Sequence, residues 1–221
     1  MEFSGPEAAD LADVRALNTA FLDYLCGPLG RRLRDELPAG LGLAVRELSE
    51  RQIQRLSTVP FLLMSCQEQD DEYWQAPTNA QSVRDLFAPT SVDTDPISQI
   101  TSATLGFLWQ LARKNAYAVR MVCGASPGWC EQLVAYSLLD VLQRTASDPQ
   151  LLVPRLANEK LFWHRLLGAG LNSNAEVRRA AHLSALQAVL VADTSIPSQR
   201  FRSAACRSQV PAFEISERRD E

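Results

Sequence analysis

The sequence has few of the residues, and little of the patterning, that usually indicate catalysis or metal binding. It contains only two histidines, His164 and His182, and neither stands in a metal-ligand pattern such as His-Glu-x-x-His. The glycine-rich phosphate loop and the dinucleotide signature Gly-x-Gly-x-x-Gly do not occur. The acidic run from Glu68 to Glu72 lacks the glycine and the ligand spacing of a calcium loop. We therefore predict no enzyme activity, no metal site and no cofactor.

The five cysteines do not form a recognisable framework. Their number is odd, their spacing is wide, and no Cys-x-x-Cys pair occurs, so neither a disulfide scaffold nor a cysteine-rich zinc site is expected. Cys26, Cys66 and Cys123 lie in apolar segments, which favours a role as small buried hydrophobes. The spacing leaves open whether Cys123 and Cys130 come together.

The chain also lacks an excess of basic residues and any long apolar run. It carries 22 Lys and Arg against 26 Asp and Glu, a net charge of −4. Strong binding to nucleic acid by the chain alone is therefore disfavoured, although a local basic patch is compatible with this balance. No uncharged apolar stretch approaches the roughly 20 residues that span a bilayer, and the first residues do not resemble a secretory signal. We predict a cytoplasmic protein without membrane contact.

A pattern that occurs twice is the main positive feature of the sequence. The second copy lies 89 positions after the first, as 163 − 74 and 143 − 54 show. A repeated helical unit predicts duplicated architecture and a pseudo-symmetric surface, which suits binding better than catalysis. The matching groups are Gln54-Arg55 with Gln143-Arg144, Pro60 with Pro149, Leu62-Leu63 with Leu151-Leu152, and Tyr73-Trp74 with Phe162-Trp163.

Helix-start and helix-stop residues punctuate the whole chain, and the alternation typical of strands is missing. We predict an all-α fold of two similar helical units, each with a helix-turn-helix-like segment, packed as a pseudo-dimer. The predicted ranges are an N-terminal unit at 1–75, a linker at 76–97, a C-terminal unit at 98–193 and a flexible tail at 194–221. The expected helices include 7–26, 41–46, 49–56, 60–74, 98–123, 137–146 and 158–167, with a restart at Ser126-Pro127 and a last helix after Asn172.

Each copy contains two short helices joined by a tight turn, an arrangement found in DNA-reading units. Ser49 and Ser137 open the second helix of each pair, and each is followed three residues later by a polar acceptor. Arginine and glutamine on the polar face can read base edges, whereas nearby acidic side chains oppose DNA, and short capped helix pairs also occur in any helical bundle. The candidate contacts to nucleic acid or to a partner are Arg51, Gln54, Arg55, Gln143 and Arg144.

The two tryptophans that end the copies, Trp74 and Trp163, are each preceded by an aromatic residue. Two interpretations stay open for them. They pack in the core against helix ends, or they are partly exposed and anchor a protein partner.

Residues 116–124 of the second copy read Ala-Tyr-Ala-Val-Arg-Met-Val-Cys-Gly, with small residues on a helix that a glycine closes. A Leu-x-Ala-x-Ser-Leu turn follows at 133–138, then Gln143-Arg144-Thr145-Ala146, Gln150-Leu151-Leu152 and Arg155. With these residues the second copy resembles the D subunit of the bacterial flagellar master regulator, the FlhD family. The resemblance spans 111–155, and fragments of 17–22 and 48–56 look similar.

The resemblance implies a helical, dimeric regulator that works with a zinc-binding C subunit to activate flagellar promoters. It implies a structural and activating role, with much of the DNA contact made by the C subunit. The chain is about twice the size expected for one such unit, which indicates a tandem fusion. Its proline-containing linker and its final helix with arginines depart from the family pattern.

Two functions follow from these observations. The first is a transcription-regulator subunit that acts through a C-subunit-like or other regulatory partner. This function is compatible with DNA contact within that complex and with a dimer. The alternative is a helical protein-interaction module, such as an adaptor, chaperone or antagonist of a regulator, without DNA binding. A shared basic face over Arg51, Arg55 and Arg144 would favour DNA, and an apolar or mixed face would favour protein.

Overall fold

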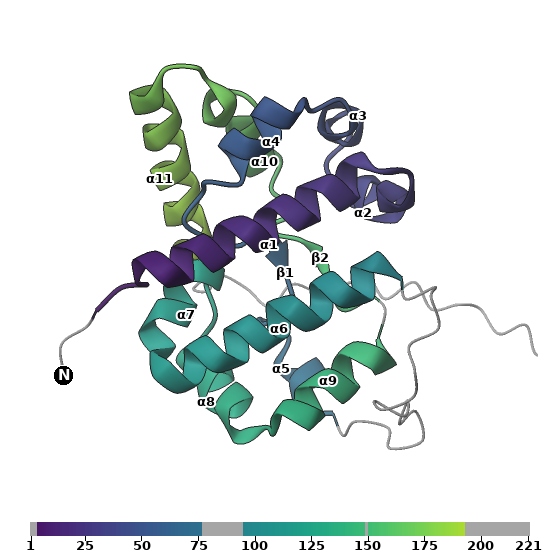
Figure 1. Ribbon diagram of the computed structural model, residues 1–221, viewed down its shortest axis with the longest axis vertical. Helices are drawn as coiled ribbons and strands as arrows, with labels where there is room; N and C mark the ends of the chain where they lie inside the picture. Colours follow the sequence, from purple (N-terminus) through teal and green to yellow (C-terminus); the bar gives the residue numbers. More distant parts are fainter. Residues whose placement is uncertain (1–3, 77–94, 149, 193–221) are drawn as a thin grey trace, which may run out of the picture.

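The computed structural model describes residues 4–76, 95–148 and 150–192, and it is mostly helical, as the sequence predicts (Figure 1). Within these residues the first half contains α1 (Ala8–Cys26), the 3-10 helix η1 (Pro28–Gly30), α2 (Arg31–Asp35), α3 (Leu41–Arg46), α4 (Glu50–Leu56), β1 (Met64–Ser65) and α5 (Asp71–Gln75). The second half contains α6 (Pro96–Lys114), α7 (Ala116–Cys123), α8 (Pro127–Ala135), α9 (Leu138–Ser147), β2 (Val153–Pro154), α10 (Lys160–Leu167), the 3-10 helix η3 (Ala169–Leu171) and α11 (Ala175–Ala192).

The helix starts predicted at Ser49 and Ser137 are confirmed. Gln52 Oε1 accepts the Ser49 N–H at 2.9 Å, and Asp140 Oδ2 accepts the Ser137 N–H at 2.9 Å. Both serines have extended backbone, so α4 and α9 each begin at the next residue. These contacts partner backbone N–H groups that a helix start would otherwise leave free.

Gly124 ends α7, also as predicted. Its φ of 69° lies in the left-handed region, and its N–H bonds to the Arg120 carbonyl oxygen. A Cβ on this residue would lie 2.7 Å from the carbonyl oxygen of Val189 in α11. Glycine is therefore required both by the backbone turn and by the close approach of the last helix.

The helix predicted for 60–74 was wrong. The chain is instead irregular up to the two-residue strand β1 and becomes helical only at α5. The side chains from Phe61 to Met64 are fully buried, and their backbone bonds to other elements. The Leu62 N–H donates to the Val122 carbonyl at 2.8 Å, and the Leu63 N–H donates to Asn18 Oδ1 at 2.8 Å. A non-helical chain in the core satisfies its polar groups this way.

The single helix predicted for 98–123 was also wrong, because two helices occupy this range. Asn115 has extended backbone between α6 and α7, with φ −158° and ψ 91°. Its side-chain oxygen accepts the Ala118 N–H at 3.1 Å, so Asn115 ends one helix and caps the next.

The two long helices α1 and α6 contact one another across the middle of the molecule (Figure 1). On the α1 side lie α2, α3 and α4 together with α10 and α11 from the second half. On the α6 side lie α8 and α9 together with α5 from the first half. One hydrophobic core joins all of these elements.

The predicted ranges 1–75 and 98–193 are consecutive in the sequence but are not separate in space. α5, at the end of the first range, lies on the α6 side, whereas α10 and α11, at the end of the second range, lie on the α1 side. The linker predicted at 76–97 and the tail predicted at 194–221 fall almost wholly outside the described residues. None of the described helices combines the length and the apolar character needed to cross a bilayer.

Candidate functional site

The two halves join through a short antiparallel ladder at the centre of the molecule. Met64 of β1 pairs with Pro154 of β2, and Ser65 pairs with Val153. Next to the ladder the Arg155 N–H donates to the Leu63 carbonyl at 2.8 Å. Sequence reasoning missed this ladder, since two-residue strands carry no alternation to detect.

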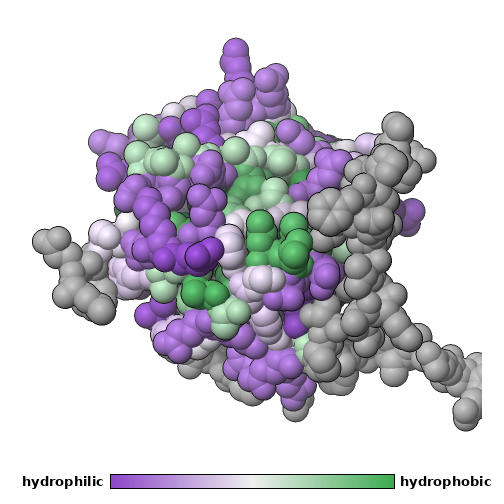
Figure 2. All heavy atoms as spheres, turned by 60° about the horizontal axis from the view of Figure 1, so that its bottom comes forward, coloured by the Kyte–Doolittle hydropathy of each residue, from purple (hydrophilic) through white to green (hydrophobic). Residues whose placement is uncertain are grey.

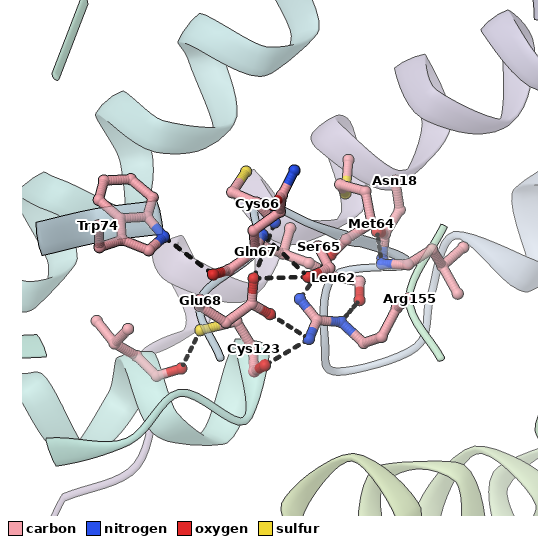
Figure 3. Close-up of polar contacts among 12 residues, drawn as sticks. Asn18, Leu62, Met64, Ser65, Cys66, Gln67, Glu68, Trp74, Cys123 and Arg155 are labelled. Carbon is pink, nitrogen blue, oxygen red and sulfur yellow. Dashed lines mark hydrogen bonds and ion pairs between the residues drawn. The ribbon is translucent and has the colours of Figure 1, made fainter. Parts of the chain in front are cut away.

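Arg155 lies beside this ladder and is 4% exposed (Figure 3). Its Nε donates to the Leu62 carbonyl at 2.6 Å, and its Nη2 donates to the Met64 carbonyl. Its Nη1 bonds to Glu68 Oε1 and to the Cys123 carbonyl. The guanidinium therefore holds β1, the end of α7 and an acidic side chain of the first half together.

Glu68 is buried opposite Arg155, and both of its oxygens are used. Oε1 accepts from Arg155, while Oε2 accepts the Ser65 hydroxyl and the Cys66 N–H, each at 2.8 Å. A buried ion pair is tolerated when its charges are paired and hydrogen-bonded in this way. The pair leaves no free carboxylate for catalysis, and we assign it a structural role.

The burial predicted for Cys66 and Cys123 is confirmed, whereas Cys26, predicted to be buried as well, is only partly buried. Cys66, Cys123 and Cys130 are each at most 1% exposed, and none of the three forms a disulfide with another described cysteine. Burial raises the pKa of the Cys66 and Cys123 thiols well above the ordinary value. These thiols are therefore packing groups rather than nucleophiles.

Arg144, a predicted contact residue, is enclosed and only 7% exposed. Its guanidinium donates to the carbonyls of Tyr73 and Ala76, both at 2.8 Å. It also lies 5.2–5.4 Å from the ring centroids of Tyr73, Trp74 and Tyr136. These contacts attach α5 to α9 through hydrogen bonds and cation–π attraction.

The other predicted contact residues are spread over separate surroundings. Arg55 donates to the Leu171 carbonyl at 3.0 Å, and Gln54 donates to Glu50 at 3.4 Å. Arg51 is exposed, and Gln143 is half-buried. Arg51, Arg55 and Arg144 therefore do not form one basic face.

Trp74 and Trp163 are fully buried, so they belong to the core and not to an exposed anchor. The Trp74 indole N–H donates to the Gln67 carbonyl at 3.0 Å, and that of Trp163 donates to the Arg155 carbonyl at 2.8 Å. Each indole also packs edge-on against the aromatic ring that precedes it in the sequence. The ring centroids are 5.6 Å apart for Tyr73 and Trp74 and 5.8 Å apart for Phe162 and Trp163. The two indoles thus have the same kinds of contact.

Residues 124–128 match the pattern Gly-x-Ser-x-Gly, whose serine is the nucleophile in some hydrolases. Here the segment joins α7 to α8 rather than a strand to a helix. Ser126 Oγ accepts the Trp129 N–H at 3.1 Å and so caps α8. The match arises because Gly124 ends α7 and Ser126 caps α8.

An apolar group is exposed where α8 meets α9, and we call it the α9 corner. It consists of Val134, Leu138 and Leu139, and the two leucines are 42% and 53% exposed. Figure 2 views the molecule from the α8 and α9 side of Figure 1 and shows hydrophobic side chains there among hydrophilic ones. The first two positions of α4, by contrast, hold Glu50 and Arg51.

Sequence reasoning did not single out Leu138 and Leu139 as surface residues. The sequence gives no clear signal for their exposure, because Leu138 lies three residues before the buried Val141 and so shares its side of the helix.

Among the described residues no group of three or more His, Cys, Asp and Glu side chains is placed to hold a metal.

Comparison with known proteins gives no relative for this chain, because no family model, curated protein or solved structure matches it. The resemblance to the flagellar D subunit therefore rests on the residues quoted for it.

Proposed function

We propose that this chain is a protein-binding subunit of a regulatory complex, built as an internal pseudo-dimer, and that it contacts its partner through the α9 corner. The observation that carries the protein-binding part is the pair of exposed leucines at the start of α9.

The order of elements supports the pseudo-dimer. α1 and α6 each have 19 residues, and α3, α4, β1 and α5 recur in order as α8, α9, β2 and α10. β1 and β2 are 89 positions apart (153 − 64) and pair antiparallel. Antiparallel pairing of a segment with its own copy is the arrangement that a two-fold axis produces.

The contacts of α5 and α10 support an exchange of elements between the two halves. α5 is held by the second half, where Tyr136 Oη donates to the Trp74 carbonyl at 2.5 Å. α10 lies against α3 of the first half, and the ring centroids of Phe162 and Phe61 are 6.0 Å apart. Each half thus completes the other, as in dimers that swap an element.

The α9 corner favours protein over DNA as the ligand. In a DNA-reading helix-turn-helix, residues in the first turn of the second helix contact base edges. In α9 these positions hold Leu138, Leu139 and Asp140. Leucine cannot donate to or accept from a base edge, and the Asp140 carboxylate repels phosphate. Exposed leucines of this kind suit the apolar centre of a protein interface.

The resemblance to the flagellar D subunit supports a regulatory setting and suggests the zinc-binding C subunit as the first partner to try. The adaptor or antagonist alternative uses the same surface with another partner. DNA contact within a complex would come from Arg51 and Gln54 on α4, which are exposed.

The proposal is tested by size-exclusion chromatography of the full chain mixed with a purified C-type subunit, together with fluorescence anisotropy on labelled promoter DNA. We expect co-elution with the subunit and no binding of DNA by the chain alone. Leu139→Ser should weaken co-elution. Leu183→Ser is the matched control, since Leu183 is also 53% exposed but lies on α11.

Two results would overturn the proposal. One is tight DNA binding by the chain alone that Arg51→Ala weakens. The other is an absence of binding both to C-type subunits and to other regulators. Equal weakening by Leu139→Ser and Leu183→Ser would place the partner site away from the α9 corner.

A further inference from the structure

A cleft of about 470 Å³ lies between α2 and α3, at the end of α1. It is separate from the α9 corner and belongs to the first half. Its basic lining groups are Arg31, Arg34 and Arg46, with Asp35 as the one acidic residue. The lining therefore carries two more positive than negative charges (three against one), whereas the whole chain carries a net charge of −4.

One of the three arginines is already used by the fold. Arg34 donates to the carbonyls of Leu25 and Gly27, where α1 ends. It thereby partners helix-end oxygens and balances the negative end of the helix dipole. The remaining charge for a ligand comes from Arg31 and Arg46, which are both exposed.

The arginines at the rim of the cleft are available to a ligand. Within the part of the chain that the structure describes, Arg31 has one ionic neighbour, Asp35, at 3.8 Å, with both side chains largely exposed. Such a surface pair contributes little, so a ligand carboxylate can replace it at small cost. Arg46 lies exposed at the end of α3.

The rest of the lining is apolar or small. Leu37, Pro38 and Leu43 contribute carbon surface, and Leu43 is 67% exposed at the edge. The close contact of α2 and α3 depends on Gly42, where a Cβ would lie 2.9 Å from the Arg34 carbonyl oxygen. The cleft thus offers an apolar floor with cationic groups at its rim.

We infer that this cleft binds an acidic peptide segment of a partner protein, with an apolar side chain against Leu43 and carboxylates on Arg31 and Arg46. Guanidinium groups bind carboxylates with paired, charge-assisted hydrogen bonds. A nucleic acid is a poorer match, because Asp35 and the apolar lining offer nothing to a phosphate backbone.

The basic rim is only partly repeated in the second half. The positions that correspond to Arg34 and Arg46 hold Cys123 and Ala135 (123 − 34 and 135 − 46 are both 89), whereas Arg31 corresponds to Arg120 (120 − 31 is also 89), which is half-buried. The chain therefore presents two chemically different surfaces, an apolar corner in the second half and a basic cleft in the first. The cleft proposal does not depend on the α9 corner.

The test is selection of a phage-displayed library of random peptides on the full chain, with counter-selection on the variant Arg31→Glu/Arg46→Glu. We expect surviving peptides to be enriched in Asp and Glu around one or two apolar residues. Their affinity should fall about tenfold or more in that variant. The control Arg15→Glu/Arg51→Glu makes the same charge change at exposed sites outside the cleft and should leave affinity unchanged.

Leu43→Ser should also weaken these peptides without altering the charge, and Leu139→Ser should not affect them. The inference is overturned if counter-selection removes no peptides, if the survivors are not acidic, or if both charge-reversal variants weaken them equally. Tighter binding of mixed-sequence DNA than of the selected peptides, lost in Arg31→Glu/Arg46→Glu, would also overturn it.

Discussion

Gln67 and Leu156 lie 89 positions apart (156 − 67), and both adopt left-handed backbone, with φ of 58° and 47°. Each follows the strand of its own half, and each precedes the helix that carries the buried tryptophan. Left-handed backbone is costly for residues other than glycine. The occurrence of the same costly turn at matching positions supports the proposed duplication.

The first prediction concerns this turn. Gln67→Gly should stabilise the chain by up to about 1 kcal/mol, because glycine relieves the left-handed cost but adds freedom to the unfolded chain. Gln54→Gly, in the exposed face of α4, should instead destabilise by about 1 kcal/mol. Urea denaturation measures both, and a clear loss of stability in Gln67→Gly would contradict the strain argument.

A second prediction concerns the buried pair of Glu68 and Arg155. Arg155→Met should lower the free energy of unfolding by about 3–5 kcal/mol, because it leaves a buried carboxylate without its partner. The double variant Glu68→Met/Arg155→Met should cost clearly less than the two single variants together. Additive losses, measured by urea denaturation, would show that the two side chains are not coupled. Glu68→Gln is a milder variant for the same cycle if a methionine variant fails to fold.

The third prediction separates Arg144 from Arg51. Arg144→Lys keeps the charge but cannot reach both the Tyr73 and Ala76 carbonyls, so it should destabilise by about 1–3 kcal/mol. Arg51→Lys, at an exposed site, should change stability by less than about 0.5 kcal/mol. Thermal or urea unfolding would contradict the clamp assigned to Arg144 if both changes had equal effects.

The fourth prediction concerns pH. Burial lowers the pKa of His182 below its ordinary value of 6.5, and nearby Arg178 adds to this, while the hydrogen bond to Gly170 opposes it. The folded state therefore binds this proton less readily than the unfolded state. The stability that depends on neutral His182 is complete above about pH 7 and falls as the pH drops through 6.5.

Urea denaturation at about pH 8 and about pH 5 tests this, with His182→Gln as the comparison. Glutamine can keep a hydrogen bond to the Gly170 carbonyl but does not titrate. The wild-type chain should lose more stability on acidification than the variant. An equal loss in both would show that other groups cause the acid sensitivity.

Local signals allowed the sequence to predict the helix ends. Ser49, Ser137 and Gly124 act through backbone hydrogen bonds and allowed φ values, which depend on a few neighbouring residues. The segment from Phe61 to Met64 could not be predicted in this way. Its partners, Asn18 and Val122, are more than forty positions away in sequence, and tertiary contacts override local preference there.

The candidate site was predictable only in part. The pattern of Gln-Arg and Trp in each copy drew attention to Arg144 and Trp74, which prove to be interior groups. A polar side chain on a predicted helix is expected to be exposed, because the sequence does not reveal which other element packs over it. α5 covers Arg144, and α5 belongs to the other half of the chain.

We propose that one of two corresponding helix starts, that of α9, carries the partner site. The most direct test measures the affinity of a C-type subunit for two variants, Leu138→Ser/Leu139→Ser and Glu50→Ser/Arg51→Ser. These change the first two positions of α9 and of α4, respectively. We expect affinity to fall about thirtyfold or more for the α9 variant and to stay unchanged for the α4 variant. Loss of binding in the α4 variant, with binding kept in the α9 variant, would contradict it.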